Sequence, residues 1–182
     1  MEEWFDQAAK TPEQELLFMN SFFVVLTTFV ASFLVWVMFV GLFILWVIDG
    51  KIKKEQVVHA LFAIAVAWLF SEITKTLIHS QRPFEINGWP THTLTTPNGN
   101  SFPSTHAAIA FSLAVSIWMH DKKIGALYII SALFVGLARV FANVHFTTDI
   151  IAGAFLGTIV SYSTRNIHLF SLLTRARLKR RK

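Results

Sequence analysis

The sequence contains no cysteine, and this absence excludes disulfides, thiolate metal sites and cysteine nucleophiles. Charge is also scarce, because Asp, Glu, Lys and Arg together make up only 15% of the 182 residues. Hydrophobic residues make up 54%, and the mean hydropathy is +0.53. A soluble domain of this length seldom buries so much apolar surface, so the composition favours a membrane protein with a single domain over residues 1–182.

The basic residues give a formal net charge of +5, but their positions argue against a nucleic-acid partner. Six of the sixteen lie in the last eight positions of the chain: Arg175, Arg177, Lys179, Arg180, Arg181 and Lys182. A basic tail that follows apolar segments is typical of a topology signal and of contact with anionic lipid headgroups. We therefore expect the lipid bilayer, and no nucleic acid, as a partner; the sequence indicates no particular oligomeric state.

Long apolar runs predict an all-α fold, an integral membrane bundle of five transmembrane helices. The first run covers residues 16–48 and is longer than the ~20 residues that cross a hydrocarbon core of ~30 Å. It predicts one long tilted helix that starts at Pro12 and bends near Thr27, after a short interfacial segment at residues 1–11. No signal peptide is expected, because this run is too long for one and follows acidic residues.

The remaining spans are shorter and closely spaced. They are predicted at residues 57–79, 103–119, 124–141 and 149–162, and the only long connection covers residues 80–102. Gly153 and Gly157 form a pair of small residues on the last span, which predicts the close approach of another helix.

Basic residues cluster on one side of this five-span arrangement. Two loops and the C-terminal tail (residues 51–54, 122–123 and 164–182) hold three, two and seven of them, twelve of the sixteen. The positive-inside rule predicts that this side is cytoplasmic, with the N-terminus outside the plasma membrane and the C-terminus inside.

Three cations are predicted at the opposite, outer ends of the spans: Lys75, Arg82 and Arg139. Cations at membrane depth are costly and often mark function. Each one alone could instead extend its charged end to the headgroups, but three on one surface favour an anion site. Glu72, one helical turn before Lys75, is expected to pair with it or with another polar group of the bundle.

Further reactive groups are predicted at the same surface. Residues 101–106 (SFPSTH) open the third span, with Pro103 suited to its first turn, so the N–H groups of residues 104–106 would point outward as an anion site. His145 and Asp149 have i, i+4 spacing at the start of the fifth span and share a helix face. Cations, a nucleophile and a proton donor are what phosphoryl transfer requires.

Three motifs in this order resemble those of the type 2 phosphatidic acid phosphatase superfamily, the membrane relatives of vanadium haloperoxidases. Residues 75–83 (KTLIHSQRP) match its K-x6-R-P motif, and residues 103–106 (PSTH) resemble its P-S-G-H motif. Residues 139–149 (RVFANVHFTTD) resemble its S-R-x5-H-x3-D motif. The spacing agrees in all three, and the resemblance covers a core at residues 57–163, before the basic tail at residues 164–182.

Two positions depart from the family pattern. Thr105 stands where the second motif has glycine, and Ala138 stands where the third motif has serine. A β-branched residue resists positive φ but fits the first turn of a helix, where the threonine hydroxyl would be an additional donor to phosphate. Neither change removes a group to which the family assigns a chemical role.

The resemblance implies a role for each remaining polar residue of the motifs. His145 attacks phosphorus and forms a phosphohistidine, Asp149 orients its ring, and His106 protonates the leaving oxygen. Phosphate binding is implied for Lys75, Arg82, Ser104, Thr105 and Arg139. No cofactor is expected. A metal bound by His145 and Asp149 is the alternative, but three nearby cations would repel it.

The substrate that the resemblance implies is a membrane lipid phosphate, hydrolysed at the outer face. The short outer loop and the sequence Ser-Phe-Pro-Ser-x-His look most like the undecaprenyl-diphosphatases linked to bacitracin resistance, which convert undecaprenyl diphosphate to undecaprenyl phosphate. The alternatives are a phosphatidylglycerophosphate, phosphatidic acid or lipid A phosphatase. From a different class, a catalytically inactive lipid-binding or transport protein could use the same fold, although His106, His145 and Asp149 are all present.

Overall fold

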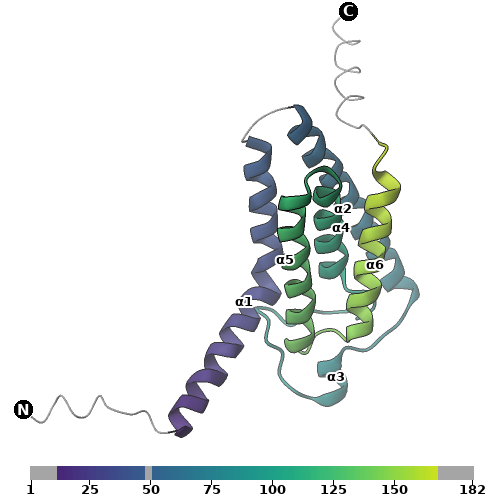
Figure 1. Ribbon diagram of the computed structural model, residues 1–182. Helices are drawn as coiled ribbons and strands as arrows, with labels where there is room; N and C mark the ends of the chain where they lie inside the picture. The colour runs from purple at the N-terminus through teal and green to yellow at the C-terminus, as the bar shows by residue number, and fades with distance from the viewer. Residues whose placement is uncertain (1–11, 48–50, 168–182) are drawn as a thin grey trace, which may run out of the picture.

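The computed structural model describes residues 12–47 and 51–167, and every regular element within them is helical. The six α-helices are α1 (Pro12–Val47), α2 (Lys51–Leu77), α3 (Pro83–Asn87), α4 (Thr105–His120), α5 (Lys122–Phe141) and α6 (Thr147–Thr164). Figure 1 shows α2, α4, α5 and α6 as a bundle, with α1 beside α5. The prediction of an all-α fold is confirmed for this part of the chain.

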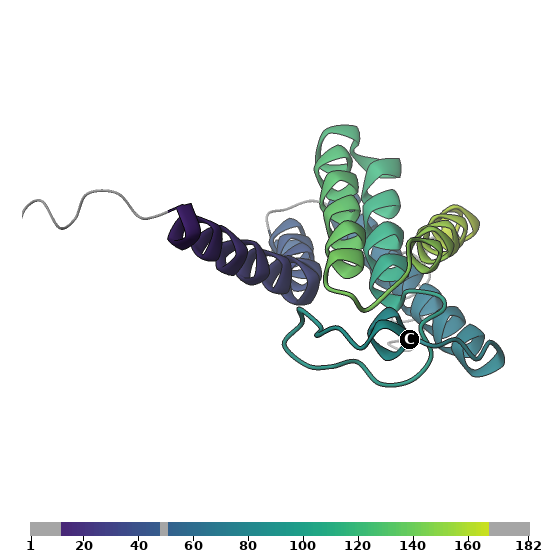
Figure 2. The same cartoon turned by 90° about the horizontal axis from the view of Figure 1, so that it is seen from below.

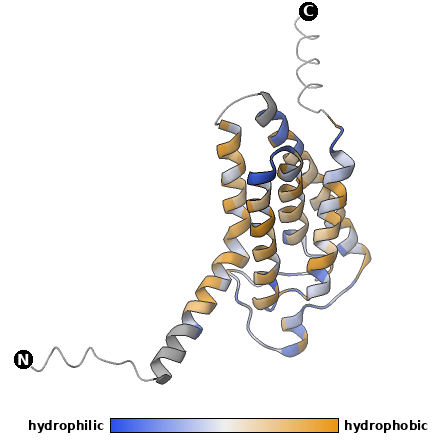
Figure 3. Ribbon diagram, viewed as in Figure 1, coloured by the Kyte–Doolittle hydropathy of each residue, from blue (hydrophilic) through white to orange (hydrophobic). Residues whose placement is uncertain are grey.

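Three of these helices are long and apolar enough to cross a membrane: Asn20–Val47 within α1, Lys54–Leu77 within α2, and Lys122–Phe141. α4 is a shorter apolar helix. Their outer surfaces carry large exposed apolar side chains, and Figure 3 shows apolar residues along the helices with hydrophilic residues gathered towards the ends. The length and hydropathy of these helices, together with their exposed apolar side chains, identify an integral membrane protein. The count of five spans stays a prediction.

The helix boundaries lie within a few residues of the predicted spans, with three differences. α2 begins at Lys51, six residues before the predicted start at residue 57, so the residues 51–54 that were predicted as a loop belong to this helix. α3 was not predicted, because residues 80–102 were expected to be loop; Pro83 opens this helix and the Glu85 carboxylate accepts a hydrogen bond from the Arg82 N–H at 2.7 Å. α4 begins at Thr105 rather than at Pro103, because Ser104 is its N-cap.

α1 is a single helix from Pro12, as predicted. Figure 1 shows that it changes direction, so that its N-terminal part points away from the bundle. The predicted interfacial segment at residues 1–11 and most of the basic tail, residues 168–182, lie outside the described residues.

The core is built around α4. Leu113 and Ile117 of α4 are fully buried and pack with Leu42 of α1, Ile64 of α2 and Val135 of α5. In a bilayer the surrounding lipid is as apolar as these side chains, so close packing rather than exclusion from water holds the helices together.

α4 and α6 approach each other most closely at two glycines. A Cβ atom added at Gly153 would collide with the carbonyl oxygen of Ser104, and one added at Gly157 would collide with that of Ala108. Beyond this contact, the Ser161 hydroxyl donates to the Ser112 carbonyl at 2.7 Å. The predicted close helix approach at Gly153 and Gly157 is therefore confirmed, and α4 is the partner.

Replacing Gly157 with leucine should lower the midpoint of thermal unfolding in detergent by about 5 °C or more, because overpacking costs about 1–3 kcal/mol. Ser163→Leu is the control, since Ser163 lies on the exposed face of the same helix. Equal midpoints for the two variants would contradict the close α4–α6 contact.

Candidate functional site

A cavity of about 500 Å³ lies at the end of the bundle where α2 and α5 end and α4 begins. Figure 2 shows the long connection between α3 and α4 lying across this end. Six of the eight residues that the motifs predicted as site residues line the cavity: Lys75, Arg82, Thr105, His106, Arg139 and His145. The other two, Ser104 and Asp149, are buried next to these lining residues.

His145 is held by the carboxylate of Asp149, one helical turn further along the chain. Its Nδ1 atom lies 3.4 Å from Asp149 Oδ2, which also accepts a hydrogen bond from the Phe146 N–H at 2.9 Å. The predicted i, i+4 contact between His145 and Asp149 is thus present, although only Asp149 belongs to α6 and His145 precedes it.

Ser101 completes this arrangement and was not among the predicted site residues. Its hydroxyl donates to Asp149 Oδ2 at 2.6 Å and lies 3.3 Å from His145 Nδ1. Because the serine proton points to the carboxylate, both neighbours of Nδ1 are acceptors, so Nδ1 carries the ring proton. The other ring nitrogen, Nε2, keeps its lone pair.

Burial of His145 also affects the protonation state of its ring. Removal from water disfavours the charged ring and lowers the pKa of His145 to about 4, against an ordinary value of 6.5; the hydrogen bond to Asp149 acts in the opposite direction. Near neutral pH the ring is therefore neutral, which is the form that can act as a nucleophile.

The N-terminus of α4 brings His106 into the same cavity. Ser104 caps the helix by accepting a hydrogen bond from the Ala107 N–H at 3.4 Å, and its own N–H donates to the Asp149 carbonyl at 3.0 Å. The N–H of Ser104 is therefore not free, contrary to the expectation that the amides of residues 104–106 all point outward. This bond instead joins the start of α4 to the first turn of α6.

Thr105 is the first residue of α4, so its β-branched side chain has a helical backbone and is not strained. Its hydroxyl donates to the Glu72 carboxylate at 3.0 Å and lies 2.9 Å from the Ser71 hydroxyl. The threonine proton thus points to a side chain of α2. Glu72 finds its polar partner in Thr105.

Arg82 is almost completely buried, and its guanidinium donates to main-chain carbonyls on two separate segments. The Nε atom donates to Gly99 at 2.9 Å and Nη1 donates to Val144 at 3.0 Å. Nη2 lies 3.4 Å from the Asn98 carbonyl and 3.3 Å from that of Asn100. Arg82 therefore fixes the loop before α4 against the residue that precedes His145.

Arg139 reaches the cavity from the last turn of α5. Its Nη1 atom donates to the Ala31 carbonyl of α1 at 3.3 Å. Its Nε atom is buried and finds no hydrogen-bond acceptor within the described residues. A buried donor of this kind is costly unless a ligand accepts from it, so it favours an anion in the cavity.

The side chains at this end of the bundle do not resemble a metal cage. Within residues 12–47 and 51–167, no three His, Asp, Glu or Cys side chains come together as a ligand set. The cavity instead combines three cations with two histidines and Glu72. Chemically, this set can bind an anion, attack it with a neutral imidazole and supply a proton.

Comparisons with known proteins agree with the motifs. A model described as the PAP2 superfamily matches residues 56–172. The chain is 34% identical over 107 residues to the "bacitracin transport permease protein BcrC" of Bacillus licheniformis. This alignment covers 57% of this chain and 51% of that protein. It is also 34% identical over 104 residues to an undecaprenyl-diphosphatase of Sulfolobus acidocaldarius, with 56% and 50% covered. The chain thus spans about half the length of these curated relatives.

A solved structure extends the likeness to most of the chain. The crystal structure of Aquifex aeolicus LpxE matches with a TM-score of 0.61 at 26% identity, and the match covers 86% of this chain and 87% of that one.

The hydrogen bonds of Arg82 predict that it stabilises the fold as well as the site. Arg82→Ala should lower the free energy of unfolding by about 2–4 kcal/mol, because several buried carbonyls lose a charged donor. Lys75→Ala is the matched control, since Lys75 is only half buried. Denaturant unfolding in detergent would measure both; a loss for Lys75→Ala as large as that for Arg82→Ala would contradict the structural role.

Proposed function

Because the chain belongs to the PAP2 superfamily, we propose that it is a membrane lipid phosphatase that uses His145 as its nucleophile. The observation that carries this proposal is the environment of His145. Its ring is neutral, its Nδ1 is held by Asp149 and Ser101, and it shares one cavity with His106 and three cations. This combination supports nucleophilic attack on a phosphate group.

In the first step, Nε2 of His145 attacks the phosphorus atom and the bond from phosphorus to the leaving oxygen breaks. His106, which is protonated when the anionic phosphate occupies the cavity, donates its proton to that oxygen and becomes neutral, and the product is a phosphohistidine on His145. Asp149 stabilises the positive charge that develops on the imidazole.

In the second step, His106 accepts a proton from water, and the resulting nucleophile attacks the phosphohistidine. The bond between phosphorus and Nε2 breaks, so inorganic phosphate leaves and both histidines return to their starting state. Lys75, Arg82 and Arg139 offset the negative charge on the phosphoryl oxygens in both steps, a role that needs no metal ion.

Ser104 contributes through its hydroxyl, because its N–H donates to the Asp149 carbonyl. Thr105 contributes through its main-chain N–H at the N-terminus of α4, where the helix dipole favours an anion, because the Thr105 hydroxyl donates to Glu72.

Undecaprenyl diphosphate is the substrate that we favour, because a relative that is 34% identical carries the name undecaprenyl-diphosphatase. Phosphatidylglycerophosphate, phosphatidic acid and lipid A are the alternatives. A second function, transport without hydrolysis, is suggested by the word permease in the name of the Bacillus licheniformis relative. Release of phosphate by the purified protein distinguishes hydrolysis from transport.

The purified protein should release phosphate in the presence of EDTA, fastest from undecaprenyl diphosphate among these four lipids. His145→Ala should lower the rate by at least about 1000-fold, because the covalent intermediate can no longer form. Phosphate release measured in detergent micelles checks both expectations.

His79→Ala is the control for this variant, because His79 is exposed and does not line the cavity. Its rate should stay close to that of the parent. Turnover by His145→Ala within tenfold of the parent would show that another group is the nucleophile.

We further propose that α1, α2, α4, α5 and α6 are five spans, with the cavity at the outer face. The 16 residues of α4 and the 18 of α6 give lengths of about 24 and 27 Å, close to the ~30 Å of a hydrocarbon core. Lys54, Lys122, Lys123 and Arg165 lie at the end of the bundle opposite the cavity. The positive-inside rule favours the cytoplasm for that end.

Single cysteines at Thr96 and Lys123, both exposed, test this orientation on a sequence without other cysteines. A membrane-impermeant maleimide should label Thr96→Cys in intact cells and Lys123→Cys only after permeabilisation, because a charged reagent does not cross about 30 Å of hydrocarbon. The reverse pattern would put the cavity on the cytoplasmic side.

A further inference from the structure

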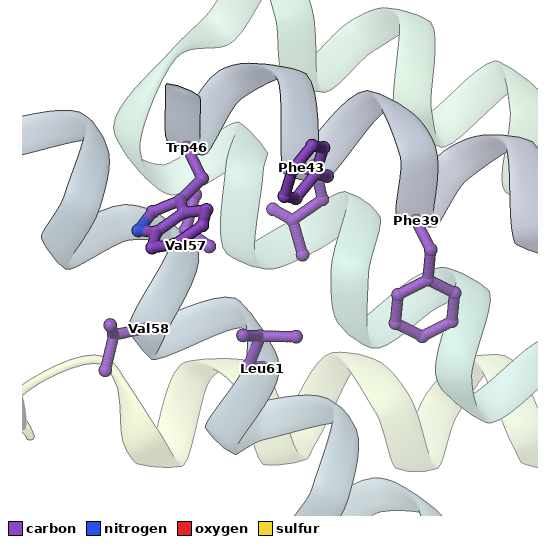
Figure 4. A pocket seen from close by; sticks show the side chains of 7 residues that line it. Phe39, Phe43, Trp46, Val57, Val58 and Leu61 are labelled. Carbon is purple, nitrogen blue, oxygen red and sulfur yellow. The ribbon is translucent and has the colours of Figure 1, made fainter. Parts of the chain in front are cut away.

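A second cavity of about 380 Å³ lies between α1 and α2, beyond the polar site. Figure 4 shows its side chains: Phe39, Phe43 and Trp46 project from α1, and Val57, Val58 and Leu61 project from α2. All of its lining residues are apolar.

The apolar cavity continues from the polar one. Phe39 lines both cavities. On α1, the lining residues Val35, Phe39, Leu42 and Trp46 recur at intervals of three and four, so they form one stripe along the helix. The polar cavity thus has one apolar wall, and that wall leads directly into the second cavity.

α2 carries a matching stripe that faces α1. Leu61 lines the apolar cavity, while Trp68, Glu72 and Lys75 line the polar one, and these positions also recur at helical spacing. The face therefore changes from apolar to charged as it approaches the cations. A lipid phosphate likewise changes from apolar to charged along its length, from its hydrocarbon chain to its phosphate group.

The distance from the polar cavity to the far end of the apolar cavity can be estimated from the length of α1. Ten residues separate Trp36 at the polar cavity from Trp46 at the far end, which corresponds to about 15 Å of helix. An extended chain advances about 1.2 Å per bond, as an extended polypeptide backbone does, so roughly a dozen bonds fit this length.

The apolar cavity and the apolar wall of the polar cavity together form a groove between α1 and α2. We propose that this groove binds the first part of one hydrocarbon chain of the substrate, while the phosphate occupies the polar cavity. The proposal rests on the lipid phosphatase function. It identifies the preferred substrates as phosphates whose chain is long enough to reach Trp46, and it makes Leu61 and its neighbours specificity residues.

The groove acts mainly by positioning. A chain that moves from bilayer to groove gains little from the hydrophobic effect, because lipid tails are equally apolar. It gains packing contacts with aromatic rings, and it fixes the phosphorus atom relative to His145. Loss of the groove should therefore lower kcat/KM for long chains and leave short substrates unaffected.

Leu61→Trp fills the groove about halfway along, and Leu69→Trp is the matched control. Both leucines belong to α2 and are half exposed, 47% and 50%, but Leu69 lines neither cavity. Phosphate release is measured with undecaprenyl diphosphate and with dimethylallyl diphosphate. They share a diphosphate, but the second has a chain too short to reach Leu61.

Leu61→Trp should lower kcat/KM for undecaprenyl diphosphate about tenfold or more, a loss of about 1.4 kcal/mol, and change that for dimethylallyl diphosphate less than about twofold. Leu69→Trp should change neither by more than about twofold. An unchanged kcat/KM for the long substrate would show that the groove holds bilayer lipid only, and an equal loss for both substrates would also overturn the proposal.

The parent protein provides a test that does not depend on the folding of a variant. Across prenyl diphosphates of increasing length, kcat/KM should rise until the chain has roughly a dozen bonds and then level off. A kcat/KM independent of chain length would overturn the groove while leaving the phosphatase function intact. No phosphate release from any of these substrates, or from the other lipid phosphates, would instead contradict the function itself.

Discussion

The contact between the backbones of α4 and α6 is the constraint on which the site depends. At Gly153 and Gly157 any side chain would collide with a carbonyl oxygen of α4 or of the residue that caps it. Next to this contact, the Ser104 N–H donates to the Asp149 carbonyl, so the two helices start side by side. His106 belongs to the first turn of α4 and His145 lies two residues before α6, and for this reason both reach one cavity.

Burying cations at this end of the bundle is costly, and the fold offsets the cost with main-chain carbonyls. Arg82 reaches carbonyls both before α4 and before His145, and Arg139 reaches that of Ala31. The hydrogen bonds of Arg82 also fix the connection before α4 to the segment that carries His145. Under the proposed function, stability and phosphate binding both depend on the Arg82 guanidinium, so a substitution of Arg82 that is intended to change substrate affinity would also disturb the position of His145.

The sequence predicted the helices and the residues that converge, because both follow from local signals. Apolar runs identify spans, and motif spacing places His145 and Asp149 in reach of each other. It did not predict Ser101 as a partner of Asp149, although Ser101 is only two residues before the P-S-x-H motif. It also assigned the Thr105 hydroxyl to phosphate, whereas that hydroxyl donates to Glu72. Both cases are contacts between residues more than 30 positions apart, which depend on how two helices pack.

α1 illustrates the same limit and shows how the fold can serve a lipid. Its hydropathy predicts a long tilted span but not the position of that span relative to α2, which determines the apolar wall of the polar cavity. α1 packs with α5 through Ala31 and the Arg139 guanidinium, while towards α2 it borders an apolar cavity lined by aromatic rings. The polar cavity therefore suits a ligand with a charged part for the cations and an apolar part for the wall that α1 forms. A phosphate attached to a hydrocarbon chain can meet both requirements at once, because its charged and apolar parts are covalently joined.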